Sequence, residues 1–192
     1  MHNPLDKFNI WWQTALSDSP LNQKSAVCVS TINREGFPEG RFVDLKEVTE
    51  RGFIFCTYFD SSKGNDIDRN PRVSLTIWWD HVGLQVRVVG LAKKISEAYA
   101  SEYWATRKRE AQLTTIAFNQ SKPISSESEL AEKYRLKSLE VGDRAITKPE
   151  NWGGYIVEPI SIEFLTFNEN RLHLRECFKN THGHWDKSLL QP

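Results

Sequence analysis

The sequence predicts a mainly β protein, a small antiparallel barrel that is closed or half closed and carries flanking helices. Short apolar or alternating segments, roughly six or seven of them, are separated by turn residues along most of the chain. Helical periodicity occurs at the start, in one short segment, and then in a single block at residues 96–140. Strands with a few interposed helices are typical of barrels flanked by helices.

The composition indicates one soluble globular domain spanning residues 1–192. Hydrophobic residues make up 39% and charged residues 26% of the chain. Lys plus Arg equals Asp plus Glu at 25 each, so no global field favours nucleic acid or a membrane surface, and we expect neither as a partner. Any anion site must therefore be local.

Cysteine and histidine spacing favours neither a disulfide framework nor a metal site. Cys28, Cys56 and Cys177 are odd in number, far apart and without a CxxC motif, so we expect reduced thiols in a cytoplasmic protein. The five histidines lack metal-ligand spacing, so no metal is predicted. Residues 1–20 lack the basic start and apolar block of a secretory signal, and no apolar run is long enough to span a bilayer.

The first half of the chain is expected to hold one opening helix, five strands and a short helix. Leu5, Phe8 and Trp12 recur at helical spacing. The segment "SSKGNDIDRNP" (61–71) suits a short helix that ends before Pro71. The predicted strands, with a turn at 33–36 and a tight "DHVG" turn, are 25–32, 40–48, 52–59, 72–79 and 84–95.

The second half changes from helical to strand periodicity. We expect two short helices within residues 96–121, a third, exposed helix at 126–140, and a charged loop at 141–151. Strand patterns return at 153–167 and 171–178, and "NTHGHW" (180–185) forms the last turn.

Three basic clusters are candidate anion sites. "RFVDLK" has Arg41 and Lys46 at its ends, on a strand. "SSKG" places Lys63 at a helix start, where free backbone N–H groups and the helix dipole favour a phosphate. "YWATRKR" sets Tyr103 and Arg107 four residues apart, on one face of a helix. Each cluster alone is also compatible with an ordinary charged surface.

The stretch "NENRLHLRECF" (168–178) adds a fourth cluster. In a strand, Arg171, His173 and Arg175 would point to the same side because successive side chains alternate. Cationic groups this close repel unless something anionic or electron-rich lies opposite. The alternative is a solvated outer face with Leu172 and Leu174 packed inward.

The order of these motifs resembles the pyridoxamine 5′-phosphate oxidase family. The shared patterns are R-x-V-x-L-K, F-x-T-x-x-x-S-x-K-G, NP-R-V-S-L, Q-V-R-V-x-G, Y-x-x-x-R, Q-S, WGGY and R-L-H-x-R. The likeness extends from about Pro4 to Pro192, and the combination of "WGGY" (152–155), "EF" (163–164) and "RLHLR" (171–175) is specific.

The resemblance implies a homodimeric FMN-binding split β-barrel of Greek-key type, with each flavin held between two subunits. It implies a flavoprotein of vitamin B6 metabolism that oxidises pyridoxine 5′-phosphate or pyridoxamine 5′-phosphate to pyridoxal 5′-phosphate with O2, giving H2O2. Arg171 and His173 would be the catalytic residues beside the flavin, and they would also contact the substrate. Its phosphate would be bound by Lys46, Tyr103, Arg107 and the position of Ala111. The implied FMN contacts are Arg41, Phe42, Val43, Lys46, Cys56, Thr57, Ser62, Lys63, Gln85, Gln120, Ser121, Trp152 and Arg175.

Several positions depart from the family pattern. The chain has Ser62 where an arginine is usual, Cys56 for a tyrosine, Ala111 for a serine, Leu174 for an aspartate and Leu189 for an arginine. The first predicted helix starts so near residue 1 that no N-terminal segment over the substrate is expected. Two alternatives stay open: a related FMN oxidase of another reduced ring, of the phenazine-biosynthesis type, and a non-enzymatic flavin- or haem-binding split barrel.

Overall fold

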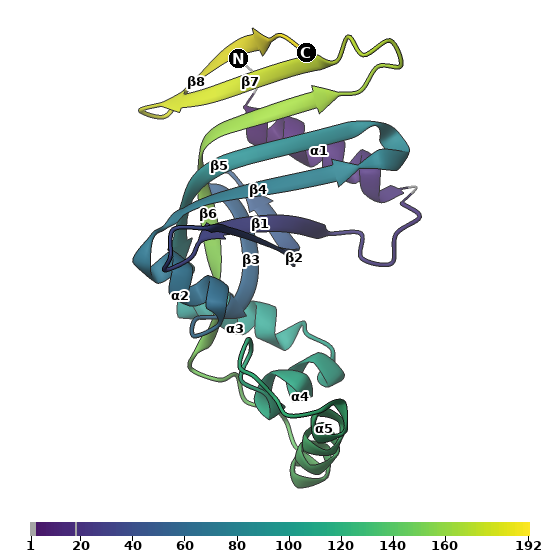
Figure 1. The fold of residues 1–192 in the computed structure, drawn as a ribbon, viewed down its shortest axis with the longest axis vertical. Coiled ribbons are helices and arrows are strands. Elements are labelled where there is room, and N and C mark those ends of the chain that lie inside the picture. The colour runs from purple at the N-terminus through teal and green to yellow at the C-terminus, as the bar shows by residue number, and fades with distance from the viewer. Residues whose placement is uncertain (1–2, 18) are drawn as a thin grey trace.

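The computed structural model describes residues 3–17 and 19–192. Eight antiparallel strands form one sheet in the order β3-β2-β1-β4-β5-β6-β7-β8, and β3 also pairs with β6. This additional pairing closes β1 to β6 into a six-stranded barrel, while β7 and β8 extend beyond it (Figure 1). The strands are β1 (Ala26–Ile32), β2 (Pro38–Thr49), β3 (Gly52–Tyr58), β4 (Arg72–Trp79), β5 (Leu84–Lys94), β6 (Trp152–Thr166), β7 (Leu174–Thr181) and β8 (His184–Leu190).

Strand β6 is divided between the barrel and the extension. Its first half, residues 152–157, pairs with β3, and its second half, residues 161–166, pairs with β7. Strand β5 runs alongside both halves, and a bulge between Val89 and Gly90 marks the point of division. A bulge bends a strand and increases its twist, so β6 leaves the barrel wall at this point and carries β7 away from β3.

Helix α1 (Pro4–Ser17) supplies one side of the main core. Its buried residues recur at helical spacing, and Phe8 is fully buried with its ring edge-on to Phe53 at 4.8 Å. Lys7 of α1 forms an ion pair with Glu176 of β7. Figure 1 shows α1 against the end of the barrel from which β7 and β8 extend.

The other helices lie toward the opposite end of the molecule (Figure 1). They are α2 (Ser62–Arg69), α3 (Glu97–Ala105), α4 (Arg109–Ala117) and α5 (Glu127–Val141). A second, smaller core joins α3, α4 and α5 to the barrel, and in it the rings of Trp104 and Trp152 meet edge-on at 5.0 Å. Among the described residues, no helix is long and apolar enough to cross a membrane.

The predicted elements are confirmed except near the C-terminus. The strand predicted at 171–178 begins only at Leu174. Arg171 has a left-handed φ of +65° and its N–H donates to the carbonyl of Asn168, so residues 171–173 belong to a turn. The prediction that strand alternation aligns Arg171, His173 and Arg175 is therefore wrong. The inward packing of the alternative is also wrong, because Leu172 and Leu174 are 65% and 45% exposed. Strand β8 was not predicted beyond its turn.

We expect Gly52→Ala to destabilise the barrel more than Gly36→Ala. Both glycines have positive φ, which costs an L-residue about 1–2 kcal/mol. A Cβ at Gly36 would meet nothing within 4 Å, whereas one at Gly52 would lie 2.1 Å from the Val157 carbonyl oxygen of β6. Overpacking adds about 1–3 kcal/mol, so urea unfolding should show a larger loss of unfolding free energy for Gly52→Ala. Equal losses would contradict a close β3–β6 approach at this glycine.

Candidate functional site

An open hollow of about 480 Å³ lies at the N-terminus of α2. It is lined by Glu39, Gly40, Arg41, Ser62, Lys63 and Ser121, so it brings together four of the predicted flavin-binding residues. Ser61 caps α2, and its side chain accepts from the Gly64 N–H. Free N–H groups of the first helical turn and two cationic side chains are suited to a phosphate group.

Lys63 is the most buried cation of this hollow, at 7% exposure. Its Nζ donates to Thr57 Oγ1 at 3.1 Å and to Gln120 Oε1 at 3.0 Å, both neutral oxygens. Burial, and then the nearby Arg41, lower the pKa of Lys63 to about 8. A buried ammonium whose acceptors are neutral fits an anionic ligand, and Thr57 and Gln120, two of the predicted flavin-binding residues, contact this ammonium directly.

Arg41 is oriented by residues that the sequence did not single out. It donates to Thr31 Oγ1 at 2.6 Å and to Glu39 at 3.1 Å, and lies 3.7 Å from Asp66. Thr31 and Asp66 are buried, and Thr31 donates to Asp66 at 2.7 Å. These contacts hold the guanidinium at the edge of the hollow. Neither a threonine in a strand nor an aspartate in a helix carries a sequence signal for this role.

A second group collects on β2, β3 and the connection between α3 and α4. The pKa of the Cys56 thiol is raised to about 11, chiefly by burial, while Lys46 and Arg107 oppose the rise and Asp44 adds to it. Tyr103 also lies within electrostatic reach of this thiol. The structure therefore brings Lys46, Tyr103 and Arg107, predicted as substrate-phosphate ligands, together with Cys56, predicted as a flavin contact.

The prediction that Tyr103 and Arg107 share a helix face is wrong. Helix α3 ends at Ala105, so Arg107 follows the helix, and Ala111 lies in α4. Arg107 donates to the Ala111 carbonyl and to Thr115 Oγ1, both at 3.2 Å, and its guanidinium lies 5.1 Å from the Trp152 ring centroid. Arg107 therefore lies near Cys56 because of the short connection between α3 and α4, and not because of a helical repeat.

A third group lies on the outer face of the sheet extension. Gln85 of β5 pairs with Leu165 of β6, and Leu165 pairs with Arg175 of β7, so the three side chains form one cross-strand row. Arg175 donates to Glu163 at 2.8 Å. Leu165, which the sequence did not single out, lies between these two polar side chains.

Arg171 and His173 lie in the turn next to this row. The Asn168 N–H donates to His173 Nδ1 at 3.1 Å, and the His173 ring packs on Phe167 at 4.6 Å. Phe167 in turn packs edge-on against Trp78 at the same distance. The position of His173 is therefore set by the turn and by packing on Phe167, and not by strand alternation.

The structure does not bring all predicted flavin residues together within one chain. Arg41 and Arg175 lie on strands β2 and β7, which are not paired with each other: β3 and β6 lie between them around one side of the barrel, and β1, β4, β5 and β6 around the other. Trp152 is 2% exposed in the helical core, beneath Arg107 and away from Gln85. Phe42 is 75% exposed on the outer face, whereas Val43 packs against the main core.

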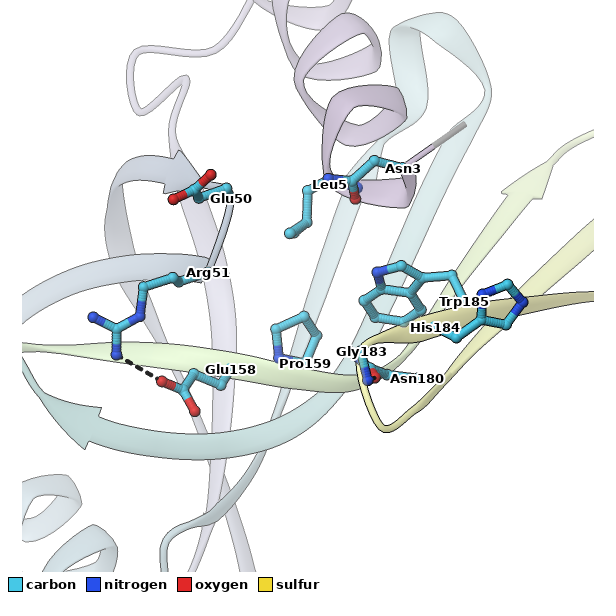
Figure 2. Close-up of a pocket in the computed structure, with 10 residues that line it drawn as sticks. All are labelled: Asn3, Leu5, Glu50, Arg51, Glu158, Pro159, Asn180, Gly183, His184 and Trp185. Atoms are coloured by element: carbon cyan, nitrogen blue, oxygen red, sulfur yellow. Dashed lines mark hydrogen bonds and ion pairs between the residues drawn. The ribbon is translucent and has the colours of Figure 1, made fainter. Parts of the chain in front are cut away.

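A larger hollow, of about 630 Å³, lies elsewhere and is lined by none of these residues (Figure 2). It lies between the start of α1, the β2–β3 turn and the β7–β8 turn, with Trp185 on one side. Its charged pair, Arg51 and Glu158, is joined at 2.8 Å, and Lys93 also pairs with Glu158. Because these charges neutralise each other, we place the binding of anionic ligands at the hollow beside α2 and not at this one.

Comparison with known proteins shows the family of the chain. The family model described as "Pyridoxamine 5'-phosphate oxidase" matches residues 15–135. The chain belongs to the pyridoxamine 5′-phosphate oxidase family. A second model, described as "Pyridoxine 5'-phosphate oxidase C-terminal dimerisation region", matches residues 152–192. The first match contains the phosphate hollow and Lys46, and the second contains β6 to β8.

Relatives named "Pyridoxine/pyridoxamine 5'-phosphate oxidase" align over nearly the whole chain. The one from Teredinibacter turnerae is 39% identical over 99% of this chain and 90% of its own length. The one from Pelagibacter ubique is 36% identical over 99% of this chain and 92% of its own length.

Solved structures share the fold. PhzG from Burkholderia lata 383, in complex with tetrahydrophenazine-1-carboxylic acid, is 26% identical with a TM-score of 0.90, covering 99% of this chain and 93% of its own. A pyridoxamine 5′-phosphate oxidase-related, FMN binding protein from Nostoc punctiforme is 17% identical with a TM-score of 0.79, and both chains are fully covered. The barrel with its strand extension is therefore the fold of this family.

We expect FMN affinity to fall as pH rises through about 8, because Lys63 then loses its charge. A bound phosphate favours the charged form, so binding takes up a proton in this range. Lys63→Met should weaken binding about 10- to 100-fold at pH 7 and flatten the pH dependence between 7 and 9. Flavin fluorescence titrations measure both effects.

The exposed Lys94 provides the control, since Lys94→Met should leave the pH dependence intact. The ligand-free protein should show the opposite trend. The unfolded chain keeps this proton up to about 10.5, so the Lys63 contribution to the unfolding free energy rises between pH 8 and 10.5. A pH-independent affinity in the unmodified protein would contradict the role of Lys63.

Proposed function

We propose that this chain is an FMN-dependent oxidase that converts pyridoxine 5′-phosphate or pyridoxamine 5′-phosphate to pyridoxal 5′-phosphate. The observation that carries the proposal is Lys63 at the α2 N-terminus, a buried ammonium group whose hydrogen-bond acceptors are neutral oxygens. It lies near the group formed by Lys46, Cys56 and Arg107. Each place holds two positively charged side chains, Arg41 and Lys63 at the first and Lys46 and Arg107 at the second, and such side chains are the usual ligands of phosphate groups. The names of the relatives, which align over 99% of the chain, support the same activity.

Lys63, Arg41 and the first turn of α2 would bind the FMN phosphate, with Ser62, Thr57 and Ser121 around it. FMN supplies the two-electron acceptor that the side chains of this chain lack. The substrate loses two hydrogens, O2 is reduced to H2O2, and pyridoxamine 5′-phosphate also consumes water and releases ammonia. The role of the protein is orientation and charge stabilisation.

Arg171 and His173 are proposed to face the reacting carbon of the substrate. The hydrogen bond from Asn168 uses Nδ1 of His173 as an acceptor, so the neutral ring carries its proton on Nε2. His173 can then donate to the substrate oxygen or nitrogen. The Arg171 guanidinium would stabilise negative charge on that atom.

A homodimer would complete the flavin site. Phe42, Trp78 and Val89 are exposed and project from the outer face of β2, β4 and β5, next to the row of Gln85 and Arg175. Joining two such faces would bring the Arg175 row of one subunit near the phosphate hollow of the other.

The free thiols of Cys28, Cys56 and Cys177 fit the reducing cytoplasm.

A second candidate is an FMN oxidase of another reduced ring. It is favoured by the TM-score of 0.90 to PhzG and by two carboxylates, Asp44 and Glu47, that contact Lys46 and Tyr103. Carboxylates beside the predicted substrate-phosphate ligands suit a substrate of lower negative charge. The substrate phosphate is the group that distinguishes the two candidates.

The FMN-loaded protein should oxidise pyridoxine 5′-phosphate with one H2O2 formed per pyridoxal 5′-phosphate. Absorbance of the aldehyde product and a peroxidase-coupled assay measure the two products. Arg171→Ala should slow anaerobic flavin reduction at least about ten-fold, equivalent to about 1.4 kcal/mol, without loss of flavin. Turnover of a dihydrophenazine carboxylic acid, with none of the B6 phosphates, would replace this proposal by the second candidate.

We expect Val89→Glu to convert a flavin-containing dimer into a monomer with weakened flavin binding. Val89 is 48% exposed on the outer face, and a charge there would be desolvated in a dimer. Leu139, 67% exposed on α5, provides the matched control Leu139→Glu. Light scattering with flavin absorbance measures both properties. A monomeric unmodified protein that retains flavin would contradict the dimeric site.

A further inference from the structure

Three charged residues of β2, Asp44, Lys46 and Glu47, lie on the outer side of the strand, near Tyr103 and Arg107. Asp44 and Lys46 are two residues apart, so alternation places both on the outer face. The β2–β3 register shifts between Leu45 and Glu47, which marks a bulge at Lys46. The bulge lets Lys46 and Glu47 both stay out of the core although they are consecutive, while Leu45 and Val48 are buried.

The two carboxylates contact the groups that are proposed to bind the substrate phosphate. Asp44 Oδ2 accepts from Lys46 Nζ at 2.5 Å, and Glu47 Oε2 accepts from the Tyr103 hydroxyl at 2.7 Å. Arg107 differs, because its hydrogen bonds go to the neutral oxygens of Ala111 and Thr115. Its buried Nε has no hydrogen-bond partner among the described residues.

The charges of this group cancel. Lys46 and Arg107 contribute two positive charges, and Asp44 and Glu47 contribute two negative charges. A phosphate dianion that approaches Lys46 and Tyr103 must displace both carboxylates or lie beside them, and like charges at contact distance oppose binding. A substrate without the phosphate meets no such repulsion.

We propose that Asp44 and Glu47 are specificity-determining residues that weaken the preference of this site for phosphorylated substrates. They do so by occupying Lys46 and Tyr103, whereas the hydrogen bonds of Arg107 go to neutral oxygens. The inference rests on the proposed function, since it concerns the same substrate site. This chain should therefore discriminate less between phosphorylated and free ring substrates than it would with the cations alone.

The position of Asp44 relative to the other charges supports this competition. The Asp44 carboxylate acts on both Cys56 and Arg107, raising the pKa of the Cys56 thiol and opposing the burial-induced fall in the Arg107 pKa. The side chain of Asp44 is 55% exposed and that of Lys46 is 25% exposed, so the pair lies at the mouth of the site and not in the core. A substrate phosphate therefore meets Asp44 on its way to Lys46.

The test compares binding of 4′-deoxypyridoxine 5′-phosphate and 4′-deoxypyridoxine, neither of which can be oxidised, to the FMN-loaded protein. Asp44→Asn and Glu47→Gln remove the charge but keep an oxygen that can accept the same hydrogen bond. Each should raise the ratio of the two affinities about ten-fold, and the double variant about 100-fold, through tighter binding of the phosphorylated probe. Calorimetric titration measures both dissociation constants.

Glu140→Gln is the control, because Glu140 forms a comparable ion pair with Lys137 on the remote helix α5 and should not change the ratio. An unchanged or lower ratio in the double variant, with normal flavin content, would overturn the inference. Oxidation of pyridoxine 5′-phosphate by the unmodified protein is scored separately. Its failure would reject the proposed function, while a raised binding ratio would still support the competition by Asp44 and Glu47.

Discussion

The pairing of β3 with the first half of β6 is the contact on which both cationic sites depend. It places Cys56, Thr57 and Tyr58 opposite Gly154, Gly153 and Trp152. Gly154 is required here, since a Cβ would lie 2.7 Å from the Phe55 carbonyl oxygen, and a Cβ at Gly153 would lie 2.5 Å from the Phe59 ring and displace it. The barrel therefore closes tightly behind the end of β3, where Thr57 contacts Lys63 and Cys56 lies within reach of Arg107.

Charge compensation differs among the cations of this electrically neutral chain. Arg41, Lys46 and Arg175 each have a carboxylate partner, in Glu39, Asp44 and Glu163 respectively. Lys63 and Arg107 are more deeply buried, and their hydrogen bonds go to neutral oxygens. Burial without a counter-charge raises the free energy of the charged form, so these two residues gain most from an anionic ligand. The three half-buried cations already have a carboxylate partner and therefore gain less from an anionic ligand.

Much of the fold and part of the site could be predicted from the sequence. Strand alternation identified β1 to β6, and the helical repeat identified α1 to α5, because both patterns record which side chains face the core. The N-terminus of α2 was predicted from "SSKG", since capping and helix polarity are local properties. The turn at Arg171 and the end of α3 at Ala105 were not predicted. A left-handed φ at an arginine has no local sequence signal, and residues 103–109 contain no proline or glycine that would mark the end of a helix.

The sequence by itself determined the class of fold, the order of the elements and which residues could bind anions. Local propensity and the periodicity of apolar residues suffice for these, because they act over a few neighbouring residues. Only the tertiary structure decided which of those residues meet. It joined Lys63 to Gln120 across 57 positions and Tyr103 to Glu47 across 56, and it left Trp152 buried beneath Arg107. Such contacts depend on how the barrel closes and where β6 bends, and these follow from the packing of the whole chain and not from any single segment.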